Sequence, residues 1–246
     1  MLVVVAGPRD DGARELAARL DALAGPARVL GAHDLAVAGW SGWIEGRPGA
    51  AARRRGMAAV VAGELVDPDQ LAGVVVRTPC VVEQDLPFIA ADDRAYVAAE
   101  MTAFLAWWLW RLPCPVLNPP TPACLCGPGW PPIQWVQRAA AMGMPVRTMR
   151  RRARFGRSEL HHLVDSPVTV TVVGRRCLGD ADPALADRAL RLAAAGGAGL
   201  LAVQFDGPGR DARVVGAHVW VDLTSAEAAE AVTAALSPRA RRRRAG

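Results

Sequence analysis

Short apolar runs alternate with helical patterns at the start of the chain, and this order predicts an α/β protein. Residues 2–6 (LVVVA) form an unbroken apolar run that ends at Gly7-Pro8, as in a buried parallel strand. Asp10 or Asp11 is then placed to cap a helix, which is marked by three leucines at helical spacing: Leu16, Leu20 and Leu23. A second strand at 27–30 (ARVL) completes a β-α-β opening of the Rossmann-like kind.

Apolar stretches further along the chain extend this pattern. They predict strands at 73–77, 115–117, 168–173, 200–205 and 214–223, and helices at 92–112, 132–142, 183–195 and 226–236. The helix at 92–112 carries a core stripe of Met101, Phe104, Leu105, Trp108 and Leu112, with Trp107 and Trp110 on its flanks. We therefore expect an α/β domain at 1–120, a connector and α+β region at 121–236, and a basic, disordered tail at 237–246.

The composition is that of a globular protein without a membrane anchor. Of the 246 residues, 52% are hydrophobic and 22% are charged, which suits a chain with a substantial buried core. The longest apolar stretch, at 101–110, is too short to span a membrane, and the first residues lack the basic region of a signal peptide. Together with an odd count of five cysteines, this predicts a reduced, cytoplasmic protein.

Basic charge is supplied by arginine alone, because the chain contains no lysine. Two clusters hold many of these arginines, six at 147–157 and five at 238–246, within a net charge of +5. Clustered basic charge is the electrostatic footprint of nucleic-acid binding. The clusters lack interleaved aromatic residues and a recognised module, so we expect no specific nucleic-acid partner and keep a basic nucleic-acid-associated protein as a further alternative.

The connector at 114–130 (CPVLNPPTPACLCGPGW) combines cysteine, proline and glycine, and it raises the question of a metal or phosphate site. Structural zinc sites use Cys-x2-4-Cys pairs and four ligands, whereas Cys124 and Cys126 are separated by one residue. In the Gly127-Pro128-Gly129 run the proline removes a backbone N–H that a phosphate loop would use. We interpret the segment as a rigid connector with buried cysteines, and we expect no bound metal.

Four segments in the middle of the chain occur in the order and spacing of a known family. They are VVVRTP at 74–79, DRAYVAAE at 93–100, PVLNPP at 115–120 and QWVQRAAAMGMP at 134–145. Together they resemble the ATP-grasp ligases, and most closely the RimK-like and graspetide-synthetase branch. The resemblance implies a Rossmann-like pre-ATP-grasp parallel sheet, followed by an α+β ATP-grasp region.

Two phosphate-binding lysines that the resemblance implies are missing. One should come from the connector, where this chain has Trp130-Pro131-Pro132, and the other from a central subdomain. Residues 146–166 are too few to hold that subdomain, so the resemblance implies a shortened, degenerate nucleotide-binding half. Arginine is not an equivalent substitute for lysine at a phosphate.

The metal ligands that the resemblance implies are also altered. Relatives hold magnesium with an aspartate and with a Glu-x-Asn on the neighbouring strand. Here Gln204 falls near the place of the aspartate, with Asp206 two residues later, and Trp220 and Asp222 fall at the Glu-x-Asn. Phosphoryl transfer depends on charge neutralisation by metal and cations, so these changes argue against turnover.

From this resemblance we predict a non-catalytic ATP-grasp-like protein, a pseudoenzyme without catalytic residues or cofactor. It would bind a protein or peptide as the partner of a modifying enzyme or ligase, with self-association left open. The alternative is an active ATP-dependent carboxylate–amine ligase that uses ATP and Mg and has arginine in place of lysine. The candidate ligand-binding residues are Arg77, Glu100, Asn118, Asp206 and Asp222.

Overall fold

A computed structural model describes residues 1–42, 57–148 and 168–237, which belong to two compact units. The first unit comprises Met1–Gly129 and Asp222–Gly246, and the second comprises Trp130–Val221. This division differs from the expected boundary at residue 120. Residues 121–129 and the C-terminal helix belong with the parallel sheet, because that helix packs against the first helix and Leu236 lies over Gly73.

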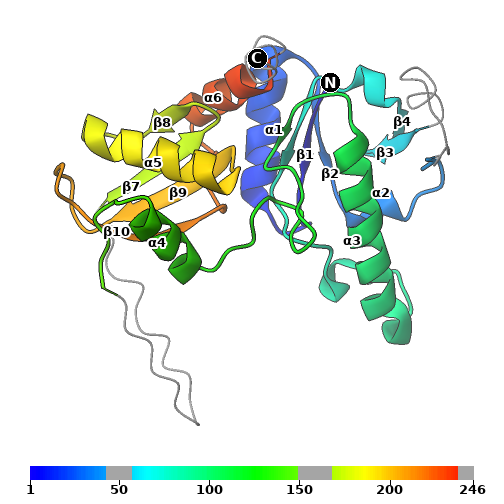
Figure 1. Cartoon of the computed structure of the whole chain (residues 1–246). Coiled ribbons are helices and arrows are strands. Elements are labelled where there is room, and N and C mark those ends of the chain that lie inside the picture. Colours follow the sequence, from blue (N-terminus) through cyan, green and yellow to red (C-terminus); the bar gives the residue numbers. More distant parts are fainter. Residues whose placement is uncertain (43–56, 149–167, 238–246) are drawn as a thin grey trace, which may run out of the picture. The chain divides into compact units, whose positions relative to one another are not determined.

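The first unit is built on a four-stranded parallel sheet, as the sequence predicts. Its strands are β1 (Leu2–Val5), β2 (Ala27–Leu30), β5 (Gly73–Val76) and β6 (Val116–Leu117), in the order β2-β1-β5-β6 (Figure 1). Every residue of β1 and β5 is buried, which explains why these strands appear in the sequence as continuous apolar runs.

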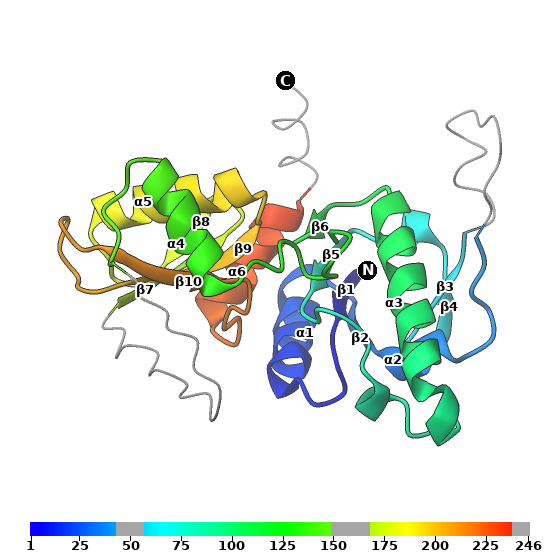
Figure 2. The same cartoon turned by 60° about the horizontal axis from the view of Figure 1, so that its bottom comes forward.

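Helices cover both faces of this sheet. Figures 1 and 2 show α1 (Asp11–Ala24) and α6 (Ala226–Leu236) on one face and α3 (Arg94–Arg111) on the other. Leu16 and Leu20 are fully buried as predicted, but Leu23 is 52% exposed. The buried face of α1 ends at Leu20, one turn before the helix does.

The aromatic residues of α3 divide between core and surface. Leu105 and Trp108 are buried, in agreement with the predicted core stripe. Trp107 is half-buried, and Trp110 is 66% exposed, so both lie on the flanks as expected. Several exposed positions of α3 are alanines, so the side chains on that part of the helix surface are short.

The second unit is an antiparallel sheet with two helices. Its strands are β7 (Val168–Val173), β8 (Arg176–Leu178), β9 (Leu200–Phe205) and β10 (Val214–His218), in the order β10-β9-β7-β8. The helices α4 (Pro132–Ala141) and α5 (Pro183–Gly196) lie beside it in Figure 2. Alternate residues Val170 and Val172 join the core with both helices, which accounts for the Val-Thr alternation of β7.

Several elements differ from the prediction. The structure adds short elements: α2 (Ala32–Leu35), β3 (Ala59–Val61), β4 (Glu64–Val66), β8, and 3-10 turns at Pro68–Gln70, Glu83–Asp85 and Ala91–Asp93. The strand predicted at 214–223 ends at His218. Most of the arginine cluster at 147–157 and the tail at 238–246 lie outside the described residues. Among the described helices, none has the length and apolarity needed to cross a membrane.

Candidate functional site

The carboxyl ends of the parallel strands form one edge of the first unit, and chemistry-bearing residues follow two of them. The chain runs from β1 through α1 to β2 on one side of β1, and later enters β5 on its other side. Such a switch point, at the carboxyl ends of parallel strands, is where open α/β sheets place their ligands. Asp10 follows β1 and Arg77 follows β5, so both lie at this point.

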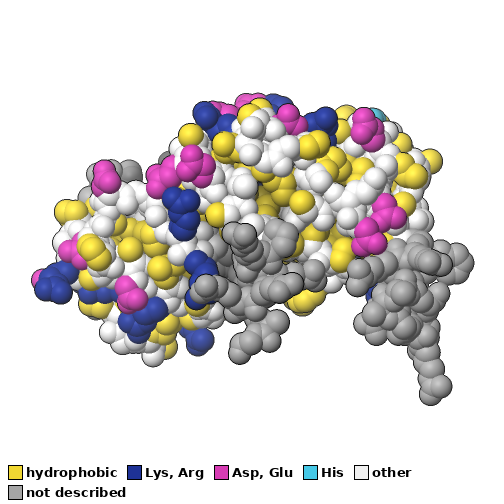
Figure 3. Space-filling view, turned by 90° about the horizontal axis from the view of Figure 1, so that it is seen from above, with side chains coloured by type: hydrophobic (Ala, Val, Ile, Leu, Met, Phe, Trp, Pro, Cys, Tyr) yellow, Lys and Arg dark blue, Asp and Glu magenta, His cyan; other side chains and the backbone are white. Residues whose placement is uncertain are grey.

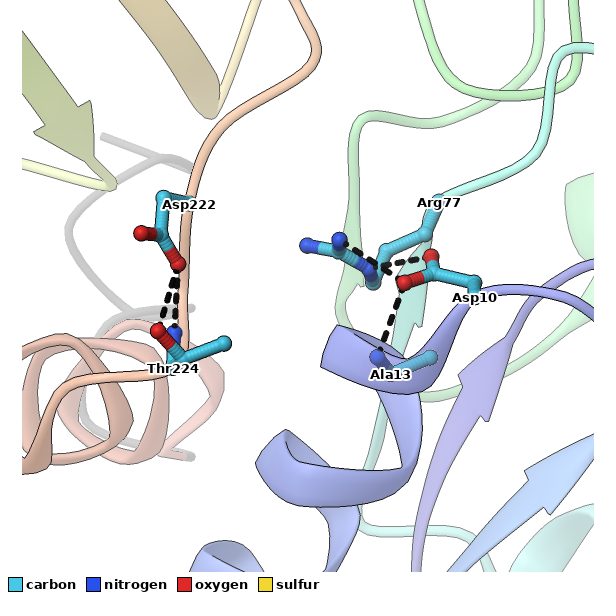
Figure 4. A network of polar contacts seen from close by, with 5 residues as sticks. All are labelled: Asp10, Ala13, Arg77, Asp222 and Thr224. Carbon is cyan, nitrogen blue, oxygen red and sulfur yellow. Dashed lines mark hydrogen bonds and ion pairs between the residues drawn. The ribbon is translucent and has the colours of Figure 1, made fainter.

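Arg77 and Asp10 form a bidentate ion pair at this edge (Figure 4). Nε of Arg77 donates to Oδ2 of Asp10 at 2.8 Å, and Nη2 donates to Oδ1 at 3.2 Å. Oδ1 of Asp10 also accepts from the backbone N–H of Ala13 at 2.9 Å, which caps α1. The side chains of Arg77 and Asp10 are 14% and 22% exposed, so the pair is partly desolvated yet reaches the surface.

Asp222 and Thr224 join this cluster from the segment before α6. A Cβ atom added at Gly12 would lie 3.4 Å from Nη2 of Arg77 and 3.5 Å from the methyl carbon of Thr224. Oδ1 of Asp222 accepts from the hydroxyl of Thr224 at 2.7 Å and from its backbone N–H at 2.9 Å. These two bonds, and more weakly the charge of Arg77, hold the pKa of Asp222 below its usual range.

Two of the five predicted residues, Arg77 and Asp222, therefore lie near one another, and we refer to Asp10, Arg77 and Asp222 as the Asp10–Arg77–Asp222 cluster. Sequence reasoning considered Asp10 only as a helix cap, although its place after β1 could have marked it. Thr224 carried no signal, because its position depends on the packing of α6 on α1.

Asn118 and Glu100 have different surroundings. Asn118 is fully buried at the end of β6, with φ at +56°, a conformation that asparagine tolerates better than most residues. A Cβ added at Gly127 would lie 3.1 Å from its Cβ, so the connector folds back on it. Asn118 thus has no surface for a ligand in this conformation, whereas Glu100 is an exposed residue of α3.

Asp206 belongs to the second unit, where Arg213 engages both of its carboxylate oxygens. The backbone N–H of Arg213 donates to Oδ1 and its Nε donates to Oδ2, each at 2.7 Å. The pKa of Asp206 is lowered, first by the backbone hydrogen bond and then by the guanidinium of Arg213, with a smaller contribution from Arg147. The structure therefore places Asp206 and Asp222 in different units, because β10 ends before Trp220 and Asp222.

Replacing Arg213 by alanine should raise the pKa of Asp206 but leave it below the ordinary value, because the backbone N–H remains. A lowered pKa stabilises the folded state above the unfolded pKa of about 3.9, and this stabilisation is lost as the pH falls through the folded pKa. Since Arg213 is exposed, we expect a loss below about 1 kcal/mol at pH 7. NMR titration of the Asp206 carboxyl measures the shift. An unchanged pKa, or an equal change in the Arg175→Ala control, would contradict the assignment.

A groove of about 620 Å³ lies in the first unit, between α3 and the segments after β5 and β6. Its α3 wall is made of small side chains, namely Ala95, Ala98, Ala99, Thr102, Ala103 and Ala106. Residues 79–84 and 121–125 form the other walls, so the connector contributes directly. This volume is in the range of sites that enclose small molecules or short peptide segments.

The residues at the expected metal positions and the basic side chains of one face lie as follows. Within 1–42, 57–148 and 168–237, no group of three or more His, Cys, Asp or Glu side chains could hold a metal ion. Gln204, near the expected ligand position, lies on β9 opposite Gly216, and Trp220 is 50% exposed. On the face shown in Figure 3, basic side chains are interspersed with acidic and hydrophobic ones.

Solved structures share this fold over nearly the whole chain. The macrocyclase MdnC from Microcystis aeruginosa MRC, bound with the precursor peptide MdnA, has a TM-score of 0.62 at 10% identity, with 96% of this chain and 99% of that chain covered. The ATP-grasp ligase PsnB, complexed with a phosphomimetic variant of a minimal precursor, Mg and ADP, has a TM-score of 0.61 at 14% identity, with 95% and 98% covered.

A RimK domain ATP-grasp protein from Sphaerobacter thermophilus DSM 20745 is also similar, with a TM-score of 0.51 at 16% identity and coverage of 96% and 98%. No protein-family model and no curated protein sequence matches the chain. The structural similarity confirms the predicted fold: the chain has the fold of the ATP-grasp ligases, with a parallel sheet followed by an antiparallel α+β unit.

Proposed function

We propose that this protein binds a peptide without ligating it, and presents that peptide to a separate modifying enzyme. Two features support a peptide as the ligand. The similar ligases PsnB and MdnC are seen with precursor peptides. The α3 wall of the groove consists mainly of alanines, of which Ala95, Ala99 and Ala103 are exposed, and these small side chains leave room for an extended peptide segment.

The Asp10–Arg77–Asp222 cluster gives the first unit a polar contact point for the same ligand. It contains two carboxylates and one guanidinium, so its formal charge is −2 + 1 = −1. Such a cluster favours an amine or a basic side chain of a peptide over a phosphate. The groove and the cluster are both built from residues of the first unit.

The case against ligation rests most directly on Asp206. This carboxylate is two residues beyond the place of the expected aspartate ligand, and both of its oxygens are engaged by Arg213. The chain also has no lysine to contact the nucleotide phosphates. Losing a single preorganised stabiliser of a developing charge typically costs about 3–4 kcal/mol in the transition state, so several such losses together should abolish turnover.

The test uses a displayed library of random peptides, selected on the purified full chain. We expect the selection to enrich peptides that bind the wild-type protein. In Ala99→Trp the indole would fill the groove, so the affinity for these peptides should fall at least about tenfold, which is a loss of about 1.4 kcal/mol of binding free energy. Glu100→Trp is the matched control, because Glu100 is also exposed on α3 but does not line the groove. Failure to enrich peptides, or equal loss in both variants, would refute groove binding.

The second arm titrates ATP and magnesium into the protein by calorimetry, with and without an enriched peptide. We expect no heat of binding at micromolar nucleotide and no ADP release. ADP release that is lost in Asp206→Ala or Asp222→Ala would instead support the alternative, an active carboxylate–amine ligase. Micromolar nucleotide affinity would contradict the proposed non-catalytic role, whatever the peptide result.

A further inference from the structure

Two cysteines of the connector lie side by side in the first unit. The Sγ atoms of Cys124 and Cys126 are 3.5 Å apart, within hydrogen-bonding distance for sulfur. Both side chains are buried, with Cys124 at 8% and Cys126 at 1% exposure, and neither is in a disulfide. The loop conformation brings the two sulfurs this close. In an extended strand, a Cys-x-Cys pair would also lie on one face, but its sulfur atoms would be farther apart.

Backbone hydrogen bonds hold the two sulfurs in this position. Thr121 and Cys124 exchange N–H···O bonds of 2.8 and 3.2 Å, which close a tight turn. The N–H of Leu125 donates to the carbonyl of Pro79 at 2.8 Å, so the turn is fixed to the segment that follows β5. A Cβ added at Gly129 would lie 3.0 Å from the Cβ of Cys124, which shows how closely the returning chain packs.

The two thiols differ in acidity for a clear reason. The side chain of Cys126, and then its backbone N–H, hydrogen-bond the sulfur of Cys124 and lower the pKa of Cys124. The same hydrogen bond, together with burial, raises the pKa of Cys126. Cys124 is therefore the member of the pair that carries the thiolate, and Cys126 keeps its proton while that negative charge is present.

Access to the pair is also unequal. Cys124 lines the 620 Å³ groove together with Cys80, whereas Cys126 lies behind it and does not line the groove. The groove is therefore the side from which a small molecule would approach Cys124. The more acidic thiol is the one that borders the groove, and the less acidic thiol lies 3.5 Å from it, which is the arrangement of an attacking and a resolving cysteine.

We propose that Cys124 and Cys126 form a thiol–disulfide exchange site that takes low-molecular-weight disulfides entering the groove. The thiolate of Cys124 attacks one sulfur of R–S–S–R, so that a Cys124–S–S–R bond forms while the S–S bond of the reagent breaks and RS⁻ leaves. Cys126 then loses its proton and attacks Sγ of Cys124, which forms the Cys124–Cys126 disulfide and releases the second RS⁻. The protein dithiol is oxidised by two electrons, and the reagent is reduced to two thiols.

The two steps are coupled through the charge on Cys124. While Cys124 is a thiolate, it holds the proton of Cys126 by hydrogen bonding. Once its sulfur is in the mixed disulfide that charge is gone, so the proton of Cys126 becomes easier to remove. Exchange at this site requires neither a bound peptide nor a nucleotide, so it is independent of the proposed function.

The test treats the fully reduced chain with oxidised glutathione and maps the products by mass spectrometry of proteolytic peptides. We expect the wild-type protein to lose two hydrogens, with a Cys124–Cys126 disulfide in the connector. Cys126→Ser should instead trap one glutathionyl group on Cys124, and Cys124→Ser should show neither product. Cys177→Ser, in the second unit, is the control and should behave as wild type.

Circular dichroism at the reaction temperature establishes that each variant is folded. Modification confined to Cys80, Cys114 or Cys177, or reaction of Cys124 only after unfolding in urea, would overturn the proposal. The pH profile adds a further readout: alkylation of Cys124 should reach half its maximal rate below the ordinary cysteine pKa of about 8.5, and Cys126→Ala, which removes the side-chain donor, should move that midpoint upward. An unmoved midpoint would contradict the proposed hydrogen bond.

Discussion

Replacing Trp135 by alanine is expected to lower the free energy of unfolding of the second unit by about 3–5 kcal/mol, because the ring is fully buried. The residue lies on α4 and joins the core between both helices and the antiparallel sheet. Its ring centroid is 4.7 Å from that of Trp130, and its edge lies against Gly196 of α5. A Cβ added at Gly196 would approach the ring to 2.4 Å, so the ring packs directly against α5 at a position that has no side chain.

Trp220→Ala provides the matched control for this change. It removes the same side chain from the same unit, but Trp220 is 50% exposed, so we expect a change within about 1 kcal/mol. Urea unfolding, followed by far-UV circular dichroism and by the fluorescence of the remaining tryptophans, measures both variants. Equal destabilisation by the two substitutions would show that Trp135 does not support the core as described.

The centre of the parallel sheet was predictable because β1 and β5 are buried on both faces. Such strands must be apolar at every position, and the runs at 2–6 and 73–77 show this without any knowledge of their neighbours. The strand β7 was equally clear for the opposite reason, since its Val-Thr alternation separates a buried face from an open one. Helices such as α1 and α5 carried caps or prolines at their starts, at Asp10 and Pro183, whereas the long helix α3 has neither.

The elements that were missed depend on contacts that a local pattern does not contain. The strands β3 and β4 have three residues each, too few for periodicity to appear. The sequence also contains no local signal for the end of β10 at His218, because Val219 and Val221 continue the alternating apolar pattern of the strand. The return of α6 to the first unit depends on Leu236 packing over Gly73, residues far apart in the sequence.

The sequence motifs also account for which residues of the candidate site were predicted. Arg77 was selected through the VVVRTP segment of the resemblance. In the structure it directly follows β5, and its ion pair with Asp10 joins the ends of two buried strands. Asp206 and Asp222 were selected together through the resemblance, which assumed that β10 continued to Asp222. Once the strand ends at His218, Asp222 becomes a residue of the first unit and meets Arg77 instead.

Replacing Asp10 by alanine is expected to destabilise the first unit by about 2–3 kcal/mol, through two separate losses. The hydrogen bond from the Ala13 N–H caps α1, and removing such a cap costs about 1 kcal/mol. The second loss is the partner of Arg77, whose side chain is 14% exposed. Breaking a fully buried pair costs about 3–5 kcal/mol, and partial exposure of this pair reduces its share to about 1–2 kcal/mol.

Asp11→Ala and Asp10→Asn separate these two contributions. Asp11 pairs with Arg14 on the surface, so its removal should change stability by less than about 0.5 kcal/mol. Asparagine keeps a capping oxygen but not the charge, so Asp10→Asn should fall between Asp10→Ala and wild type. Urea unfolding at pH 7 with hydrogen exchange of the α1 amides measures all three. If Asp10→Ala were no more destabilising than Asp11→Ala, the ion pair at the sheet edge would not support α1, and the Asp10–Arg77–Asp222 cluster would lose its structural basis.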